Sequence, residues 1–352
     1  MGNYMKAVIL LEPGRLELRD IPLTTCKEGE VLIKVMACGI CSSDIKMAVH
    51  GHRELQYPRI LGHEIVGIVI ESGSRLFKEG DRVQVAPGLR CGRCKACLKG
   101  MDNQCRNRKI LGFTHDGGFA QYIMLPLEGP FWGSLNLIPE DTGLFEAVLA
   151  EPLACCINAQ KKAKVSRGDK VLIIGGGVTG HLHSIVATIL GAEDIFLSEP
   201  LTYRRSISTG AKISRRIDPT EEDLYQIIME ETDGYGADVI ILACSDLCPA
   251  QFMRFLAPGG RLCLFSGIPH KDSKAYLDLN TIHYQELQIV GAYGCSALHN
   301  REAVSIISSK RFSLKNLITR SIPLEELQDV LMGGISPDEM KIIVEVEKWM
   351  KD

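Results

Sequence analysis

The sequence has little excess charge of either sign and no long apolar run. Its 40 Lys and Arg residues nearly balance 43 Asp and Glu residues, so the formal net charge is −3. This balance gives no broad attraction to nucleic acid or to an anionic membrane, and we expect neither as a partner. No stretch approaches the roughly 18 apolar residues of a membrane-spanning helix. The start of the chain also lacks the apolar run of a secretory signal, which favours a cytoplasmic protein.

Internal repeats and low-complexity segments are absent too, and cysteine is the residue type that stands out. Thirteen cysteines in a chain without a secretory signal indicate metal binding or reactive thiols rather than disulfides. One tight cluster lies between Cys91 and Cys105. Cys155, Cys156, Cys244 and Cys263 are scattered in apolar runs instead, so we expect them to be small buried side chains.

A length of 352 residues suggests two domains, and the predicted secondary-structure pattern changes along the chain. The first part is rich in short β-branched segments separated by Gly, Pro and Asp, which predicts strands. These strands are Lys6–Leu11, Val31–Met36, Ile65–Ile70 and Arg82–Ala86. A helical stretch over residues 144–163 follows.

From about residue 170, predicted strands alternate with predicted helices, which is typical of a parallel sheet with crossover connections. The strands are Lys170–Ile174, Asp194–Ser198, Asp238–Ala243 and Arg261–Ser266, and the helices are 181–190, 221–231 and 250–256. A Pro-Gly-Gly turn is expected between the last helix and the last strand. Beyond about residue 290 the pattern is mixed again, and Ile342–Val346 is expected to return as a strand to the first domain.

A glycine-rich motif follows the first strand of this alternating part. Gly175, Gly177 and Gly180 form G-x-G-x-x-G before an expected helix, with Val178 and Thr179 between the last two glycines. In that context the glycines permit a tight turn, close approach of a pyrophosphate and close helix–strand packing. The helix N-terminus adds N–H groups and partial positive charge for the phosphates. These five residues are therefore predicted to bind a dinucleotide, although a glycine-rich turn without a ligand is the alternative.

The end of the next strand indicates which dinucleotide binds. Glu199 follows Asp194–Ser198, where a carboxylate can accept hydrogen bonds from the adenosine ribose and repel a 2′-phosphate. This favours NAD over NADP. Arg204 and Arg205 point the other way, because an arginine near that strand end can hold a 2′-phosphate, so Arg204 is kept as a cofactor-binding candidate.

The cysteine cluster has the spacing of a metal site. Cys91, Cys94, Cys97 and Cys105 are arranged as C-x2-C-x2-C-x7-C, and four thiolates at such spacing can surround one tetrahedral Zn²⁺. Four protein ligands complete the coordination shell, so we interpret this as a structural site whose metal stabilises an exposed loop. An iron–sulfur cluster takes four cysteines as well and is the alternative ligand, and a metal-free loop is the other.

Taken in order along the chain, several motifs make the sequence resemble one family, the zinc-containing medium-chain dehydrogenases, in its sorbitol, polyol and threonine dehydrogenase branch. The motifs are CGICSSD (Cys38–Asp44), GHE (Gly62–Glu64), GDRV (Gly80–Val83), the four-cysteine cluster, DGGFAQY (Asp116–Tyr122), EPLA (Glu151–Ala154) and the fingerprint with Glu199. The resemblance implies an α/β chain. A GroES-like β-rich catalytic domain (1–157 and 290–352) carries the structural zinc lobe (about 88–110), and a doubly wound Rossmann domain (158–289) binds NAD.

The resemblance also implies a second, catalytic zinc ion, hence two per chain. Cys41 and His63 would be its ligands, with Glu64 and Glu151 completing the set. Alcohol dehydrogenases proper carry a cysteine at the position of Glu151, whereas polyol and threonine dehydrogenases carry a glutamate. Glu64 would bind the metal directly or through water. Asp44 would not bind the metal itself but would orient the imidazole of His63.

Further roles follow from the same resemblance. Zinc would lower the pKa of a substrate hydroxyl, and NAD would accept the hydride. Ser43 would take the hydroxyl proton, and Ser266, Gly267 and Ile268 would line the nicotinamide. Lys46 stands where the family often has a histidine, so it either binds the ribose as a fixed cation or relays the proton.

We therefore expect an enzyme that oxidises a secondary alcohol, of polyol or sugar-alcohol type, to a ketone with NAD. An L-threonine 3-dehydrogenase or a dehydrogenase of an inositol derivative is the alternative enzyme. The non-enzymatic alternative is a crystallin-like or nucleotide-sensing protein that kept the fold of the family. A homo-oligomer, dimer or tetramer, is implied by the family. The loops expected to shape the substrate pocket are His50–Tyr57 and Leu127–Trp132.

Overall fold

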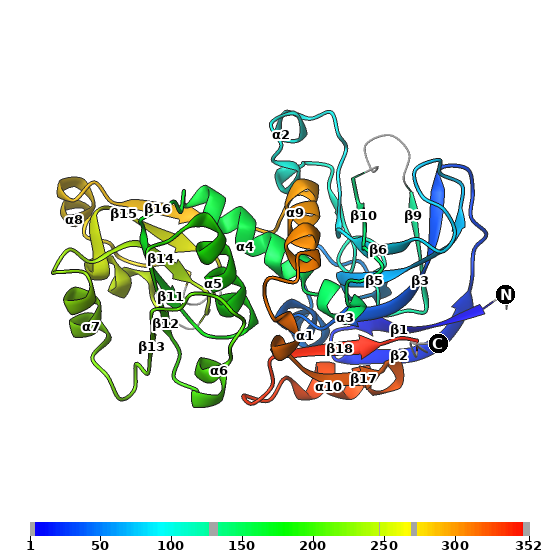
Figure 1. The fold of residues 1–352 in the computed structure, drawn as a ribbon. Coiled ribbons are helices and arrows are strands. Elements are labelled where there is room, and N and C mark those ends of the chain that lie inside the picture. Colours follow the sequence, from blue (N-terminus) through cyan, green and yellow to red (C-terminus); the bar gives the residue numbers. More distant parts are fainter. Residues whose placement is uncertain (1–3, 127–132, 246, 269–272, 348–352) are drawn as a thin grey trace. The chain divides into compact units, whose positions relative to one another are not determined.

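The computed structural model describes residues 4–126, 133–245, 247–268 and 273–347 (Figure 1). The chain divides into two compact units, Met1–Ala154 with Cys295–Asp352, and Cys155–Gly294. The domain limits expected from the sequence, after residues 157 and 289, stay a prediction. The predicted pocket loop Leu127–Trp132 lies outside the described residues. Within the described residues, every helix is too short or too polar to cross a membrane.

The first unit is built on a seven-stranded sheet. Its strand order is β10-β6-β5-β3-β18-β17, and β9 also pairs with β3. The bounds are β3 (Glu30–Gly39), β5 (Glu64–Ser72), β6 (Arg82–Val85), β9 (Tyr122–Pro126), β10 (Leu135–Leu137), β17 (Ile318–Pro323) and β18 (Lys341–Glu345). The strand predicted near the end of the chain is confirmed as β18, which pairs antiparallel with β3. Residues from both ends of the sequence therefore share one sheet.

Smaller elements complete this unit. A three-stranded sheet joins β1 (Tyr4–Glu12), β2 (Arg15–Pro22) and β4 (Arg59–Ile60), and a two-stranded sheet joins β7 (Gly88–Leu89) and β8 (Lys109–Ile110). The helices are α1 (Ser42–His50), α2 (Lys95–Leu98), α3 (Leu144–Ala147), α9 (Ala297–Ser308) and α10 (Leu327–Gly333).

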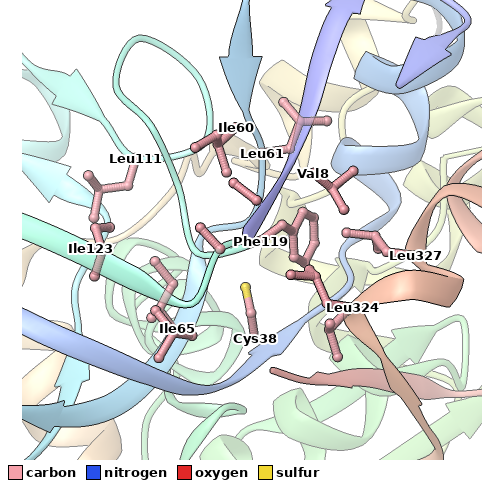
Figure 2. Packing of buried hydrophobic residues seen from close by; sticks show 14 of the residues in the cluster. Val8, Cys38, Ile60, Leu61, Ile65, Leu111, Phe119, Ile123, Leu324 and Leu327 are labelled. Atoms are coloured by element: carbon pink, nitrogen blue, oxygen red, sulfur yellow. The ribbon is translucent and has the colours of Figure 1, made fainter. Parts of the chain in front are cut away.

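The core of the first unit is formed by inward-facing residues of these sheets and by α10. Figure 2 shows the Phe119 ring among Val8, Leu324 and Leu327, with the Cys38 side chain nearby. Phe119 and Cys38 are both fully buried. Burying such side chains contributes roughly 1.5–3 kcal/mol each, so this cluster fixes where α1 and the loops around His63 can lie.

The second unit is a six-stranded sheet in which every neighbouring pair is parallel. Its order is β13-β12-β11-β14-β15-β16. The bounds are β11 (Lys170–Ile174), β12 (Asp194–Ser198), β13 (Arg215–Ile217), β14 (Ala237–Leu242), β15 (Leu256–Leu264) and β16 (Gln288–Gly291). Counted along the chain, the order is 3-2-1-4-5-6, the doubly wound arrangement expected from the sequence. The direction of winding reverses between β11 and β14.

Helices cover both faces of this sheet because its strands are apolar on both sides. Val171 and Ile173 of β11 pack in one cluster with alanines of α4 (Ala150–Lys162) and α5 (Val178–Leu190). Leu172 and Ile174 belong to the opposite cluster, which includes residues of α7 (Leu224–Glu231) and η3 (Pro249–Phe255). Strands buried on both faces are expected to be continuous apolar runs, as β11 is.

Three local predictions differ from the structure. The single helix expected over 144–163 is two helices, α3 and α4, interrupted at residues 148–149. Pro152 has no N–H to donate to the Val148 carbonyl group, so one bond of a continuous helix is missing there. The expected helix 250–256 is the 3-10 helix η3. The expected Pro-Gly-Gly turn lies inside β15, where a register shift between β14 and β15 accommodates it.

Candidate metal and dinucleotide sites

The four cysteines of the cluster meet around one point, as the sequence predicts for a metal site. Their sulfur atoms all lie within 4.8 Å of one another. The Cys94 and Cys97 sulfurs are 3.5 Å apart, and those of Cys91 and Cys97 are 4.0 Å apart. Tetrahedral Zn–S bonds of about 2.3 Å place sulfur atoms about 3.8 Å apart, so this geometry fits a zinc ion.

The electrostatics of this cluster also suit a cation. A hydrogen bond from the backbone N–H of Cys97, helped by hydrogen bonds from the neighbouring cysteine side chains, lowers the pKa of Cys94 to about 6. The backbone N–H groups of Arg93 and Cys94 lower the pKa of Cys91 as well. Burial acts in the opposite sense on Cys97 and raises its pKa to about 12. Thus part of the thiolate charge that a metal requires is stabilised by the loop backbone alone.

A second group of potential ligands forms between α1 and β5. One ligand atom each of Cys41, His63 and Glu64 lies within 4.8 Å of the other two. Cys41 is the residue before α1, and Glu64 is the first residue of β5. Both His63 and Glu64 are buried. Residues far apart in the sequence therefore converge where the sequence predicts the catalytic zinc.

Asp44 ties these two segments together. It is fully buried, and its Oδ2 accepts a hydrogen bond from the backbone N of Cys41 at 2.9 Å. Its Oδ1 lies 3.3 Å from the backbone N of Gly62 and 3.3 Å from Nδ1 of His63. Asp44 thus faces one ring nitrogen of His63, which leaves Nε2 as the nitrogen able to bind a metal.

The charge around His63 favours a cation. Burial lowers the pKa of His63, but the Asp44 carboxylate and the Cys41 thiol outweigh it, so the pKa is raised well above its ordinary value. A pocket that draws a proton onto a buried imidazole is a pocket with excess negative potential. A divalent cation in the same place would meet that potential, which is the fit that a zinc site requires.

Glu64 has a partner that the sequence did not reveal. Lys341 Nζ donates hydrogen bonds to both carboxylate oxygens of Glu64, at 2.8 and 2.7 Å, and to the carbonyl of Ile40 at 3.1 Å. Both side chains are buried, Lys341 at 6% and Glu64 at 1% exposure. Gly39 makes room for this pair, because a Cβ there would lie 2.0 Å from Glu64 Oε2. If Glu64 bound zinc directly, the metal and the Lys341 ammonium group would compete for the same two carboxylate oxygens.

Glu151 lies in the first turn of α4 and is buried. It is not a member of the group formed by Cys41, His63 and Glu64, and one of its carboxylate oxygens lies 3.7 Å from the Cys295 sulfur. Glu151 contributes to raising the pKa of Lys341, as do Glu64 and Cys41, while burial lowers it. The carboxylate is therefore in the same electrostatic neighbourhood as the other predicted ligands.

Ser43 and Lys46 both lie on α1. The Ser43 hydroxyl is buried and has no hydrogen-bond partner among the described residues. A buried hydroxyl without a partner is uncommon, and a ligand hydroxyl is one group that would satisfy it. Lys46 is exposed, so its predicted role at the ribose stays a prediction.

In the second unit the glycine-rich turn has the geometry that its sequence predicts. Gly175 has φ +102°, and Gly177 is the residue before α5. A Cβ at Gly180 would lie 1.9 Å from the carbonyl oxygen of Gly175, so only glycine permits this approach of helix and strand. Nothing lies within 4 Å of a Cβ position at Gly177, which leaves the backbone there open to a ligand. Val178 and Thr179 form the first turn of the helix.

Glu199 stands beside this turn. Its Oε2 accepts the backbone N–H of Gly176 at 2.7 Å, and its Oε1 accepts that of Leu201 at 2.9 Å. Arg205 does not face outward from here, since its guanidinium contacts Asp218 at 2.9 Å and the Glu199 carbonyl at 2.6 Å. Arg204 is half-buried in α6 (Thr202–Ser206).

The predicted cofactor residues share one edge of the sheet. The glycine-rich turn follows β11, Glu199 follows β12, and Ser266, Gly267 and Ile268 follow β15. The backbone N of Ser266 donates to the carbonyl of Leu242 at the end of β14. Carboxyl ends of parallel strands beside a reversal of strand order are where such sheets bind dinucleotides.

Comparisons with known proteins identify the family to which the chain is similar. Residues 27–131 match the alcohol dehydrogenase GroES-like domain, and residues 179–309 match the zinc-binding dehydrogenase domain. The chain is 32% identical to the sorbitol dehydrogenase of Bacillus subtilis, covering 93% of this chain and 92% of that one. It is also 32% identical to the L-threonine 3-dehydrogenase of Pyrococcus horikoshii, covering 91% and 92%. A zinc-binding dehydrogenase from Sinorhizobium meliloti, solved with NADP, superposes with a TM-score of 0.90 at 30% identity, covering 98% of this chain and all of that one.

Proposed function

The chain belongs to the zinc-type medium-chain dehydrogenase family, and within it we propose an enzyme that transfers a hydride from a secondary alcohol of polyol type to NAD, giving a ketone. Family membership makes it a zinc-binding, NAD(P)-linked oxidoreductase. The observation that carries the polyol proposal is Glu151, a buried glutamate whose charge acts on Lys341, at a motif position where alcohol dehydrogenases proper carry a cysteine.

We propose that Cys41, His63 and Glu151 hold the catalytic zinc ion. Glu64 stays beside them as the partner of Lys341, and a small movement off Lys341 would let it bind the metal as well. The bound ion supplies the Lewis acidity that lowers the pKa of a substrate hydroxyl. Three protein ligands leave one position open for that hydroxyl. Cys91, Cys94, Cys97 and Cys105 would hold the second, structural ion.

The chain's own residues then handle the proton. Ser43, whose buried hydroxyl has no hydrogen-bond partner among the described residues, would accept a hydrogen bond from the substrate hydroxyl and relay its proton by passing on its own. Lys46 lies one turn further along the same helix and is exposed, which suits a cation at the cofactor ribose. Asp44, itself fixed by the backbone N–H of Cys41, lies 3.3 Å from His63 Nδ1 and would orient the His63 ring.

NAD is the proposed cofactor in preference to NADP. A 2′-phosphate would approach the Glu199 carboxylate, and Arg205 is engaged with Asp218 rather than turned towards such a phosphate. The Sinorhizobium meliloti relative was solved with NADP, so the family uses both. Arg204 is the residue that would bind the phosphate if the preference were reversed.

Changing Glu199 should alter cofactor choice. Glu199→Ala removes the acceptor for the ribose, and we expect kcat/KM for NAD to fall about tenfold. Glu199→Gln keeps one acceptor for the Gly176 N–H but removes the negative charge, so activity with NADP should rise relative to NAD. The measurement is kcat/KM with each cofactor, and Glu193→Ala, an exposed glutamate just before β12, is the control. A wild-type preference for NADP would contradict the proposal.

The substrate class is tested by NAD reduction with sorbitol, xylitol, galactitol, inositol, L-threonine and butanediol. We expect the highest kcat/KM with an open-chain polyol. L-Threonine 3-dehydrogenase is the second candidate, favoured by the similarity to the Pyrococcus horikoshii enzyme, and a highest value with threonine would establish it. A highest value with inositol would indicate the cyclic polyol instead.

A further inference from the structure

A continuous series of buried polar side chains leads to Glu151 in the first unit. Asn136 Nδ2 donates to Gln84 Oε1 at 2.9 Å, and Gln84 Nε2 donates to Asn300 Oδ1 at 3.1 Å. Asn300 Nδ2 donates in turn to the Cys295 sulfur at 3.1 Å. The Cys295 sulfur lies 3.7 Å from Glu151 Oε1, within reach of an S–H donor. The series thus crosses from β10 through β6 and α9 to the first turn of α4.

Every hydrogen bond in this series runs in the same direction, towards the carboxylate. Because Asn300 donates to the Cys295 sulfur, that sulfur acts as an acceptor, and its own proton is left to be donated to Glu151. Hydrogen bonds aligned in one direction polarise one another and strengthen. The alignment therefore presents a donor, and never an acceptor, to the predicted metal ligand.

Burial makes this arrangement specific. Gln84 and Asn300 are each 1% exposed, and Asn136 is 5% exposed. Buried amides cost free energy unless their hydrogen bonds are made, so each member restricts the orientation of the next. Gln84 is further fixed by a bond from its Nε2 to the Val85 carbonyl.

The start of α9, which carries Asn300, is held on two sides. Ser296 accepts the backbone N–H of His299 at 3.3 Å, and the Ser296 carbonyl accepts Asn300 Nδ2 at 3.0 Å. The backbone N of Ala297 donates at 3.3 Å to Asp102, a buried residue of the four-cysteine lobe. The helix end is thereby anchored to the four-cysteine loop, and Asn300 cannot move without breaking these contacts.

We propose that Cys295 and Asn300 are positioning residues that hold the Glu151 carboxylate in place for the catalytic zinc ion. This rests on the ligand role of Glu151 in the proposed function. Partners that orient a metal ligand typically change metal affinity or activity by about 10–100-fold when they are removed. Neither residue touches the metal or the substrate in this role.

The test compares zinc retention at the catalytic site in Cys295→Ala, Cys295→Ser and Asn300→Ala. We expect Cys295→Ala and Asn300→Ala to raise the zinc dissociation constant, measured by chelator competition, by about tenfold. The kcat of these two variants should fall as their zinc affinity falls, while the KM for NAD stays unchanged. Cys295→Ser keeps a donor to Glu151 and should restore both quantities. Cys248→Ala, at an exposed cysteine, is the matched control.

Cobalt substitution supplies a second readout. In Co²⁺-loaded protein, Cys295→Ser should keep the thiolate-to-metal charge-transfer band of the catalytic site, because Cys41 is the thiolate there. Loss of part of that band, together with zinc loss like that of Cys41→Ser, would make Cys295 a ligand and overturn the positioning role. If Asn300→Ala fails to fold, the Cys295→Ala and Cys295→Ser pair decides the outcome.

Glu151→Ala, measured alongside, separates this inference from the proposed function. If Glu151→Ala loses the catalytic zinc while Cys295→Ala and Asn300→Ala retain it with wild-type affinity, the positioning role alone is overturned. If Glu151→Ala itself retains both zinc ions and full turnover, the ligand role of Glu151 fails, and the positioning role fails with it.

Discussion

Replacing Cys41 with serine is expected to remove one zinc ion per chain and to lower turnover by about 10³-fold, while the protein stays folded. The reason is that Cys41 precedes α1 and is half-buried, and its sulfur atom lies within 4.8 Å of ligand atoms of His63 and Glu64. The helix start would persist, because the Asp44 carboxylate accepts the backbone N–H of Cys41 and a serine there can also cap the helix. Elemental analysis and steady-state kinetics measure the two effects.

Cys94→Ser is the matched comparison, since it removes a thiolate from the other predicted site. This variant should also lose one zinc ion per chain, but the measured effect should be lower stability rather than lower turnover. The reason is that α2, which follows Cys94, buries no residue, so we expect the loop to depend on the metal to stay folded. Cys248→Ser, at an exposed cysteine, should retain both ions. If the wild-type protein bound only one zinc ion when metal is supplied, one of the two sites would be refuted, and binding of none would refute both.

Lys341→Met is expected to destabilise the first unit by about 3–5 kcal/mol, the range found when a buried ion pair loses one partner. The Glu64 carboxylate would remain at 1% exposure with its two hydrogen bonds from Lys341 removed. The double variant Lys341→Met with Glu64→Gln should recover most of the loss, because it leaves no uncompensated charge. Denaturant unfolding of the zinc-loaded protein measures both variants.

Lys310→Met is the control for this experiment. Lys310 pairs with Asp141 on the surface, where the two side chains are 54% and 69% exposed. Exposed ion pairs contribute roughly 0–1 kcal/mol, so this variant should unfold almost as the wild type does. If Lys341→Met were no less stable than Lys310→Met, the buried pair would not hold Glu64 as described.

The parts of this protein that could be predicted from the sequence are those whose signals are local. The turn at Gly175–Gly180 and the spacing of the four cysteines each lie within about one loop, and their chemistry follows from short-range geometry. The family and the fold class were predicted from such motifs and are confirmed. The break between α3 and α4, just before Pro152, also had a local signal, which the helical pattern around it obscured.

Long-range pairs of buried side chains had no such signal. Lys341 lies 277 residues from Glu64, and Asn300 lies 216 residues from Gln84. A lysine at the start of a strand and an asparagine in a helix are ordinarily solvated, so neither could be distinguished from surface residues in the sequence. Folding places them in the first unit's interior, where a charge or an amide must find a partner. Candidate metal ligands could be predicted from the sequence, but only the packing of β18 and α9 determines which side chains lie against them.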